Sequence, residues 1–259
     1  MPTITAADGC PINVEIEGSE GAPVMILSNS LGTNLHMWDD QMPGWSKHFR
    51  VVRYDRRGHG KSGVPKGPYS MEIFGRDVLA IADSLKIKKF NWCGLSMGGM
   101  VGQWLGANAP ERIEKLILSN TNFNYADKAP WNDRIKLIKE KGLASLVDPN
   151  MERWFTKGFR ERAPQAIAKI KAEFLATDPI GYVACCEAIR DMDFTASNPT
   201  ITVPTMVIVG SQDPATPPAA GEAIAKQIKG AKLVALEAAH IANIEQPKIY
   251  AETVINFLQ

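Results

Sequence analysis

The sequence has no marked excess of either charge, no long apolar run and few cysteines. Its 29 Lys and Arg residues nearly balance 28 Asp and Glu residues, for a net charge of +1, whereas a nucleic-acid-binding protein usually carries a basic excess. No apolar stretch reaches the roughly 18 residues of a transmembrane helix. The first nine residues lack the charged start and the apolar run of a signal peptide. We therefore expect a cytoplasmic protein that binds neither nucleic acid nor membrane.

The four cysteines have neither the density nor the spacing of a disulfide framework, so reduced thiols are expected. They are Cys10, Cys93, Cys185 and Cys186. The adjacent pair, Cys185 and Cys186, is poorly placed for a disulfide with each other and is predicted to pack as buried apolar side chains. No Cys/His cluster has the spacing of metal ligands, so the sequence predicts no bound metal.

The composition is typical of a folded globular protein. Of 259 residues, 45% are hydrophobic and 22% are charged, which excludes disorder as the main state. Single α/β units reach this size. Two alternating segments, residues 3–7 and 11–17, are separated by a turn containing Asp8 and Gly9. They predict an antiparallel hairpin at the N-terminus.

Six short apolar runs follow the hairpin and are typical of buried parallel strands, whose two faces are covered by helices. They are residues 23–27, 49–54, 90–93, 113–118, 205–209 and 232–236. Helical patterns lie between several of them, at residues 71–85, 97–108 and 218–228. Together these segments predict an α/β fold with a mostly parallel, eight-stranded sheet.

One segment interrupts this alternation. Residues 122–198 contain no convincing strand and are interpreted as several helices carrying scattered aromatic side chains. The segment falls between two predicted strands at the carboxyl edge of the sheet, where open α/β sheets bind ligands. We therefore predict a helical cap at 122–198 inserted between core segments 1–121 and 199–259. The alternative is a set of extra helices without a functional role.

The strongest chemical signal is the sequence Gly-Leu-Ser-Met-Gly-Gly at residues 94–99, placed after an apolar strand and before a helix. A serine on such a sharp turn exposes its hydroxyl, and its neighbours two positions away must be small because helix and strand pack closely. Gly94 and Gly98 meet that need. This context predicts that Ser96 is a nucleophile; the alternative is an idle serine in a glycine-rich turn.

A serine nucleophile needs a base, and the chain has only four histidines. His240 lies just after the last predicted strand, so its loop reaches the same sheet edge as Ser96. His59 also follows a strand and is the competing candidate, although a structural role in bracing its turn is the favoured interpretation. His36 and His48 precede or begin a strand. We predict His240 as the base.

The acid that orients the base is expected between Ser96 and His240 in the chain. Asp213 follows the predicted strand 205–209 and therefore lies at the same edge. Asp191 and Asp193 also fall in this interval but belong to the predicted cap. Asp213 is the predicted acid, with capping of the following helix as its alternative role.

Acyl transfer also requires backbone donors for the oxyanion. The residue after the nucleophile provides the Met97 N–H. The loop after strand 23–27 provides the second, and counting from the strand end selects Leu31. The Ser30 hydroxyl is a candidate contact for substrate, with ordinary loop turn chemistry as the alternative.

The order Ser96, Asp213, His240, together with these loops, resembles the α/β-hydrolase family over essentially the whole chain. Serine at the turn separates the sequence from dehalogenases and epoxide hydrolases of this fold, which use aspartate. Within the family the sequence is similar to the 3-oxoadipate enol-lactonases. The similar segments are residues 27–33 with 37–38, 54–62, 94–105, 110–112 and 119–121.

This resemblance implies a carboxylic ester hydrolase that opens 3-oxoadipate enol-lactone to 3-oxoadipate in aromatic catabolism, through an acyl-enzyme and without a cofactor. Other serine enzymes of the fold remain alternatives, namely carboxylesterases, carbon–carbon bond hydrolases and perhydrolases. A ligand-binding receptor is the non-enzymatic alternative, although a protein that only binds has no need for all three of Ser96, Asp213 and His240. The sequence does not indicate an oligomeric state.

The implied substrate carries a free carboxylate, which needs a cation or hydrogen-bond donors. Four cap residues are candidates for this contact: Arg134, Lys157, Arg160 and Arg190. Each has a solvated surface charge as its alternative role. Trp131 and Trp154 are candidate walls of an apolar pocket, with packing inside the cap as their alternative.

Overall fold

A computed structural model describes residues 3–259 and contains one eight-stranded sheet in the order β1-β2-β4-β3-β5-β6-β7-β8. The β1–β2 and β2–β4 pairs are antiparallel and all the other pairs are parallel, so the predicted fold is confirmed. The strands are β1 (Thr3–Thr5), β2 (Pro11–Glu17), β3 (Val24–Ser28), β4 (Arg50–Tyr54), β5 (Phe90–Leu95), β6 (Ile113–Ser119), β7 (Thr205–Gly210) and β8 (Lys232–Leu236).

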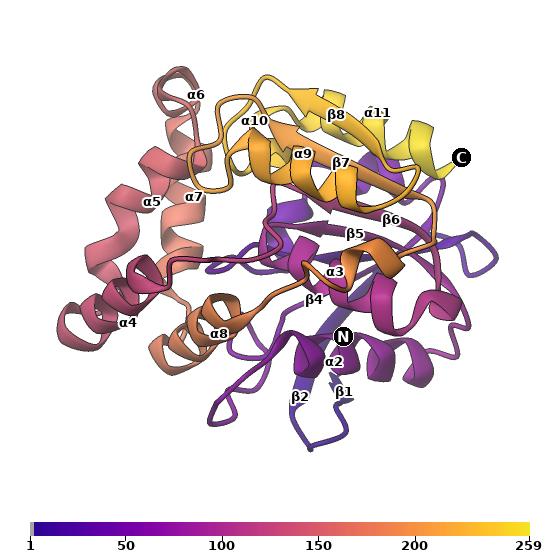
Figure 1. Ribbon diagram of the computed structural model, residues 1–259, viewed down its shortest axis with the longest axis horizontal. Coiled ribbons are helices and arrows are strands. Elements are labelled where there is room, and N and C mark those ends of the chain that lie inside the picture. Colours follow the sequence, from indigo (N-terminus) through magenta and orange to yellow (C-terminus); the bar gives the residue numbers. More distant parts are fainter. Residues whose placement is uncertain (1–2) are drawn as a thin grey trace.

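Helices cover both faces of the sheet (Figure 1). Trp92 and Cys93 are consecutive in β5 and therefore point to opposite faces. The Trp92 indole donates to the Gly98 carbonyl of α3, whereas the Cys93 thiol lies 3.7 Å from the Tyr250 hydroxyl of α11. The core helices are α1 (Met42–Trp45), α2 (Met71–Ser84), α3 (Met97–Asn108), α9 (Pro218–Gln227), α10 (Ala242–Glu245) and α11 (Pro247–Leu258), with short 3-10 turns at Leu35–Trp38, Pro110–Arg112 and Asn198–Thr200.

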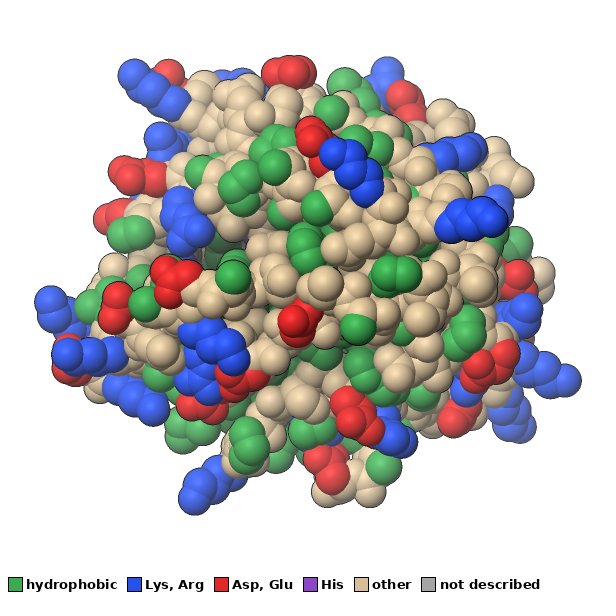
Figure 2. Space-filling view, in the orientation of Figure 1, with side chains coloured by type: hydrophobic (Ala, Val, Ile, Leu, Met, Phe, Trp, Pro, Cys, Tyr) green, Lys and Arg blue, Asp and Glu red, His purple; other side chains and the backbone are tan. Residues whose placement is uncertain are grey.

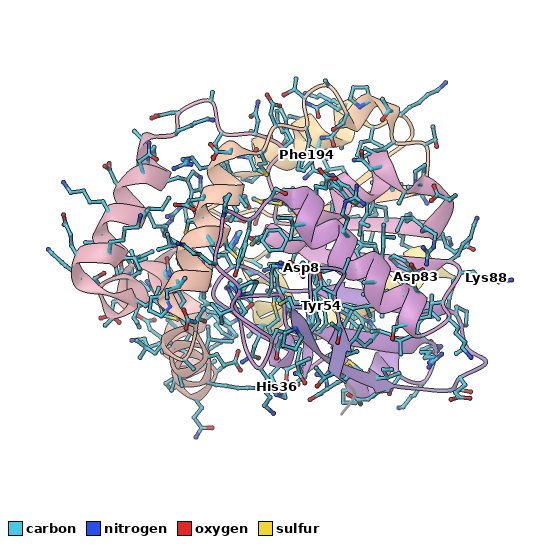
Figure 3. The ribbon with its side chains drawn as sticks, turned by 90° about the horizontal axis from the view of Figure 1, so that it is seen from below. Asp8, His36, Tyr54, Asp83, Lys88 and Phe194 are labelled. Atoms are coloured by element: carbon cyan, nitrogen blue, oxygen red, sulfur yellow. The ribbon has the colours of Figure 1, made fainter. Side chains whose placement is uncertain are left out.

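Five α-helices occupy the segment between β6 and β7, and we call residues 122–198 the cap. They are α4 (Ala129–Lys141), α5 (Val147–Trp154), α6 (Lys157–Arg162), α7 (Pro164–Leu175) and α8 (Pro179–Asp191), with a 3-10 turn at Leu143–Leu146. Where the segment begins and ends, a hydrogen bond of 2.8 Å joins the Phe194 N–H to the Phe123 carbonyl. In Figures 1 and 3 the cap helices lie beside the sheet, at one end of the molecule. The division into a core and a cap domain stays a prediction.

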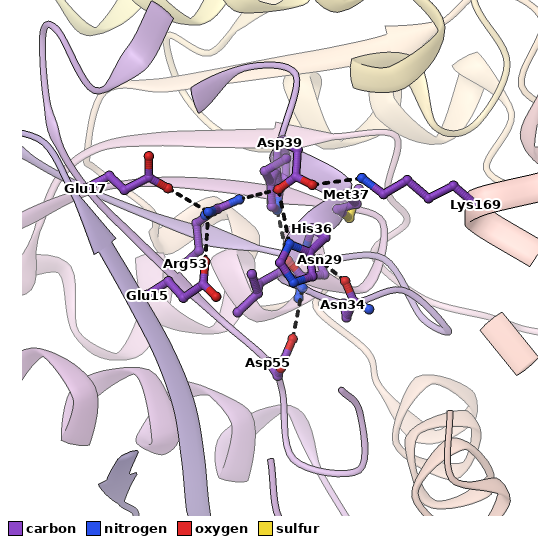
Figure 4. Close-up of polar contacts among 12 residues, drawn as sticks. Glu15, Glu17, Asn29, Asn34, His36, Met37, Asp39, Arg53, Asp55 and Lys169 are labelled. Carbon is purple, nitrogen blue, oxygen red and sulfur yellow. Dashed lines mark hydrogen bonds and ion pairs between the residues drawn. The ribbon is translucent and has the colours of Figure 1, made fainter. Parts of the chain in front are cut away.

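An ion-pair network centred on the buried Arg53 attaches the cap to the core (Figure 4). Lys169 of α7 contacts Asp39 at 2.8 Å, and Asp39 contacts the buried Arg53 of β4 at 2.7 Å. Arg53 also contacts Glu15 at 2.9 Å and Glu17 at 2.6 Å, both from the neighbouring strand β2. The network therefore ties α7 to the antiparallel side of the sheet.

The surface carries both signs of charge side by side on the face shown in Figure 2. Within residues 3–259, no helix combines the length and the apolar character needed to cross a bilayer. All four cysteines are buried and free, and burial raises the pKa of the Cys185 thiol to about 12.

Candidate active site

Ser96 lies on the turn that joins β5 to α3. Its backbone has φ 57° and ψ −115°, a conformation that a residue with a side chain rarely adopts. Hydrogen bonds hold the strained turn from both sides: the Ser96 N–H donates to the Ser119 carbonyl at 2.8 Å, and the Gly99 N–H donates to the Ser96 carbonyl at 2.9 Å. The surrounding sheet and helix therefore maintain the strain and present the hydroxyl at the carboxyl end of β5.

Close packing around the turn explains its glycines. A Cβ atom on Gly94 would lie 2.1 Å from the Gly98 carbonyl oxygen, and one on Gly98 would lie 2.2 Å from the Ser28 carbonyl oxygen. Both distances are far below van der Waals contact, so neither position accepts a larger residue without movement of the backbone. This is the physical requirement expected from the sequence spacing.

The structure brings Ser96, His240 and Asp213 into one hydrogen-bonded chain. His240 Nε2 lies 2.8 Å from Ser96 Oγ, and His240 Nδ1 lies 2.8 Å from Asp213 Oδ2. Asp213 follows β7 and His240 follows β8, so parallel strands deliver all three residues to the same edge of the sheet. In this geometry His240 can accept the serine proton while Asp213 orients its ring.

Asp213 is buried among hydrogen-bond donors. Its Oδ1 accepts the Ala215 and Thr216 N–H groups at 2.8 and 3.0 Å, and its Oδ2 accepts the Thr216 hydroxyl at 2.8 Å and the Asn120 amide at 3.1 Å. Burial raises the pKa of Asp213, but the facing His240 and these hydrogen bonds outweigh it, so the pKa is lowered overall. The carboxylate is therefore ionised at neutral pH.

The loop after β3 faces Ser96. Leu31 and Ser30 line the cavity next to it, and the Gly98 N–H donates to the Asn29 carbonyl at 3.1 Å, which ties this loop to the start of α3. Within the described residues, neither the Leu31 N–H nor the Met97 N–H donates a hydrogen bond to the chain. Both predicted oxyanion donors are therefore available.

A cavity of about 270 Å³ opens above Ser96, between the sheet edge and the cap. Its lining contains the side chains of two arginines and no aspartate or glutamate. The lining residues are Ser30, Leu31, Ser96, Met100, Tyr125, Pro130, Trp131, Arg134, Arg153, Trp154, Tyr182, Ile189, Ala215, Thr216 and His240. An apolar pocket with two cations and no carboxylate is suited to an anionic ligand.

Comparison with known proteins places this geometry in a family. Residues 23–141 match the model of the alpha/beta hydrolase fold, and residues 183–259 match the model described as TAP-like protein. The 3-oxoadipate enol-lactonase 2 of Acinetobacter baylyi is 39% identical over 252 residues, which cover 97% of this chain and 94% of that protein. The chain belongs to the α/β-hydrolase family.

Solved structures agree with this assignment. The enol-lactonase from Burkholderia xenovorans superposes on this hydrolase with a TM-score of 0.97 at 44% identity, over 99% of both chains. A thermophilic esterase from Thermogutta terrifontis has a TM-score of 0.91 at 27% identity, over 99% of this chain and 96% of that one. The prediction of a hydrolase with this fold is confirmed.

In this hydrolase the cap supplies much of the cavity wall. Trp131, Trp154 and Arg134 line the cavity, as the sequence predicted. Arg134 donates to the Tyr182 hydroxyl at 2.7 Å, and its guanidinium lies 5.6 Å from the centre of the Trp131 ring. Its charge is therefore held in place by the cap itself.

The other predicted cationic contacts lie elsewhere. Neither Arg160 nor Arg190 lines the cavity. Arg190 pairs with Asp191 at 2.6 Å and contacts Asn132 at 3.1 Å on the cap surface, and the exposed Lys157 lies 3.8 Å from Glu161. The prediction that Arg160, Arg190 or Lys157 contacts a substrate carboxylate is therefore corrected, because none of the three lines the cavity. The helix face that points inward is set by packing between cap helices, which the local pattern did not reveal.

Sequence reasoning missed several residues of the site. Arg153 at the end of α5 lines the cavity, and no hydrogen bond or ion pair joins its side chain to the rest of the described chain. Partial burial and the positive charge of the neighbouring Arg134 lower the pKa of Arg153.

Two residues that hold Asp213 were also missed. They are Asn120, with φ 44°, and Thr216. The sequence offered a signal for each: Asn120 directly follows β6, and Thr216 lies three residues after Asp213.

His59 occupies the structural role favoured by the sequence. It is fully buried, and its Nε2 accepts the Gly32 N–H at 2.9 Å. Burial and the nearby Arg56 charge lower the pKa of His59 to about 3, so the ring is neutral and able to accept that hydrogen bond. His59 thus braces the loop that carries Leu31 and is not among the residues that line the cavity.

Proposed function

We propose that this hydrolase opens 3-oxoadipate enol-lactone to 3-oxoadipate, with Ser96 as the nucleophile. The observation that carries the proposal is the hydrogen-bonded chain of Ser96, His240 and Asp213, which opens into a cavity containing cations and no carboxylate. The enol-lactonase relatives match over nearly the whole length, including the cap that forms the pocket.

The first step forms an acyl-enzyme. His240 takes the proton of the Ser96 hydroxyl while Ser96 Oγ attacks the lactone carbonyl carbon. The N–H groups of Leu31 and Met97 donate to the resulting oxyanion, which accumulates charge only during reaction. Collapse of this intermediate breaks the ring C–O bond and leaves an acyl ester on Ser96.

The leaving group is an enolate, which is a better leaving group than an alkoxide and makes a modest demand on His240 as acid. Its oxygen takes the proton that His240 received from Ser96, which gives an enol and a neutral His240. A water molecule, deprotonated by His240, then attacks the acyl ester and releases Ser96 with its proton restored. The enol tautomerises to the 3-oxo acid. Each proton taken by His240 is returned within the cycle, so the reaction consumes only lactone and water.

The substrate carboxylate is proposed to contact Arg153 and Arg134. These are the two cations of the cavity lining, and charge-assisted hydrogen bonds from guanidinium to carboxylate are stronger than neutral ones. Arg134 already bonds Tyr182 and Asn150, whereas Arg153 has all its donors available. Arg153 is therefore the principal partner, and Ser30 together with Trp131 and Trp154 completes the proposed binding surface.

Replacing Arg153 with glutamine is expected to raise KM for the lactone by about 10- to 100-fold, the effect of losing a hydrogen bond to a charged group worth about 1.5–3 kcal/mol. Hydrolysis of neutral 4-nitrophenyl acetate should change little, because that ester has no carboxylate to bind. Steady-state kinetics on both substrates measures the difference. Arg160→Gln is the matched control, since Arg160 does not line the cavity, and it should leave both substrates unaffected.

An equal loss on the lactone and the neutral ester would exclude Arg153 as the carboxylate partner. Arg134→Gln is less diagnostic, because it also removes the contacts to Tyr182 and Asn150 and so disturbs the cap. If Arg153→Gln is without effect and Arg134→Gln raises KM selectively, the role passes to Arg134.

Incubating the protein with freshly prepared 3-oxoadipate enol-lactone tests the proposal directly. We expect rapid loss of the lactone ultraviolet absorbance and formation of one equivalent of 3-oxoadipate. Loss no faster than the spontaneous reaction, combined with hydrolysis of 4-nitrophenyl acetate, would retain a serine hydrolase and discard the lactone as substrate. Carboxylesterase, carbon–carbon bond hydrolase and perhydrolase substrates would then be tried in turn.

The proposed reaction belongs to the breakdown of aromatic compounds and requires no metal or organic cofactor. A cytoplasmic location, expected from the sequence, stays a prediction.

A further inference from the structure

Glu245 is a buried carboxylate outside the set of residues considered so far. It ends the short helix α10, five positions after His240, and is only 4% exposed. Among the ion pairs of the described residues, none involves Glu245. Its Oε2 accepts the Ala239 N–H at 3.0 Å and the Thr156 N–H at 3.3 Å, and its Oε1 accepts the Thr156 hydroxyl.

These hydrogen bonds join two distant parts of the chain. Ala239 immediately precedes His240, whereas Thr156 lies in the cap between α5 and α6, where its hydroxyl also accepts the Phe159 N–H. A second bond runs in parallel, from the Ile241 N–H to the Trp154 carbonyl at 3.0 Å. The backbone on both sides of His240 is therefore attached to the end of α5, once directly and once through Glu245.

This attachment bears on the reaction for two reasons. Trp154 and Arg153, at the same end of α5, line the cavity, so one segment both lines the cavity and is bonded to the loop that carries His240. A displacement of about 1 Å in a reacting group can cost about 100-fold in rate. Burying a carboxylate without a cation is also costly, and only its hydrogen-bond donors offset that cost.

We infer that Glu245 is a positioning residue that couples the seating of the cap to the alignment of His240 with Ser96. When the α5–α6 junction rests on Glu245, Ala239 and hence His240 are held at hydrogen-bond distance from Ser96. When the junction lifts, Glu245 loses its Thr156 donors, and the loop that carries His240 loosens with it. The inference rests on the proposed function of Ser96 and His240.

The ion pair between Lys169 and Asp39 provides a matched comparison. It also joins the cap to the core, at 2.8 Å, but its core partners are Arg53 and the strand β2 (Figure 4). Among the described residues, no hydrogen bond or ion pair joins Lys169 or Asp39 to the loop that carries His240. A variant that breaks this pair tests attachment of the cap alone, without the proposed link to His240.

The experiment compares Glu245→Ala with Lys169→Met by two measurements. The first is the rate at which diethyl 4-nitrophenyl phosphate, a neutral reagent without a carboxylate for the cap arginines, modifies Ser96. The second is kcat and KM for the lactone. Glu245→Ala is expected to slow modification and lower kcat by about 10-fold or more, with a smaller change in KM. Lys169→Met should leave the modification rate within about twofold of wild type.

Glu245→Gln serves as the conservative variant. Its amide oxygen can accept the two backbone N–H groups while its NH₂ group donates to the Thr156 hydroxyl oxygen, so modification should return close to the wild-type rate. This rescue distinguishes positioning by hydrogen bonds from any requirement for the negative charge itself.

Modification of Glu245→Ala at the wild-type rate, with only KM raised, would overturn the inference and leave Glu245 as a cap anchor. If that variant fails to fold, Thr156→Val decides. A slower modification rate at unchanged KM supports the inference, and an unchanged rate overturns it. If the wild-type protein fails to react with diethyl 4-nitrophenyl phosphate or with the enol-lactone, that result would instead overturn the proposed function.

Discussion

Replacement of Ser96 with alanine is expected to lower kcat for the enol-lactone by about 10⁴-fold or more, the size of effect seen when a serine nucleophile is removed. The variant cannot form the acyl ester, whereas the oxyanion donors and the cavity remain. Folding should be preserved, because the turn is held by its backbone hydrogen bonds to Ser119 and Gly99 rather than by the hydroxyl. The measurement is loss of lactone absorbance under single-turnover and steady-state conditions.

Labelling with diethyl 4-nitrophenyl phosphate, followed by mass spectrometry, identifies the nucleophile independently of turnover. The wild-type protein should gain one diethyl phosphoryl group on Ser96, and Ser96→Ala should gain none. Ser145→Ala is the control, because Ser145 lies in the cap and does not line the cavity. Substantial lactone turnover by Ser96→Ala, above that of a mock preparation, would refute the acyl-enzyme mechanism.

Asp213→Asn is expected to lower kcat by about 10⁴-fold while leaving KM nearly unchanged. Oδ1 of Asp213 faces two backbone N–H groups, those of Ala215 and Thr216, so the asparagine oxygen takes that position and its NH₂ group faces His240. An NH₂ group donates to Nδ1 and so places the ring proton on Nε2, where it blocks transfer from Ser96. Kinetics of the purified variant over a range of pH measures the loss.

The same variant has a pH signature in stability. The native pKa of Asp213 lies below its ordinary value of 3.8, so its ionised form stabilises the fold above about pH 4, and this contribution is lost as the pH falls through the native pKa. The difference in free energy of unfolding between wild type and Asp213→Asn should therefore be largest near neutral pH and shrink in acid. Urea unfolding at pH 7 and at pH 3 measures it. A difference that is constant with pH would show that Asp213 is not held as a carboxylate.

The two predictions differ in what they probe. The Ser96 variant tests whether the serine hydroxyl is the reacting group, and the Asp213 variant tests whether the orientation of His240 matters. Asn120 and Thr216 would give milder versions of the second effect, because each supplies only part of the set of donors around Asp213.

Local sequence patterns predicted the sheet and the placement of Ser96, Asp213 and His240 at one edge of it. Two alternating segments and six short apolar runs marked all eight strands, and β8 was predicted at its observed bounds. Differences were confined to ends: the first strand stops at Thr5 because the Ala6 N–H and carbonyl already bond Cys10 and Gly9 in the turn. The central strand β5 runs on to Leu95 through pairing with β6.

Predictions within the cap were less successful. Trp131, Trp154 and Arg134 line the cavity, but Arg160 and Arg190 do not, and Arg153 was missed. On α4, Trp131 and Arg134 line the cavity, whereas Asn132 and Asp133 between them do not. Which face of each short helix points inward depends on how α4, α5 and α8 pack on one another, and charged residues on such helices carry no local mark of that choice.

The sequence by itself determined which strand each reactive residue follows. A serine between glycines follows one strand, and an aspartate and a histidine follow two later strands. The carboxyl ends of parallel strands lie at one edge of the sheet, so residues that directly follow such strands come close together there. Only the tertiary structure decided what surrounds these groups. The donors to Asp213, the cations of the cavity and the Glu245 bridge from Thr156 to Ala239 join segments far apart in the chain. Such contacts arise from packing between elements, and no periodicity within one element encodes them.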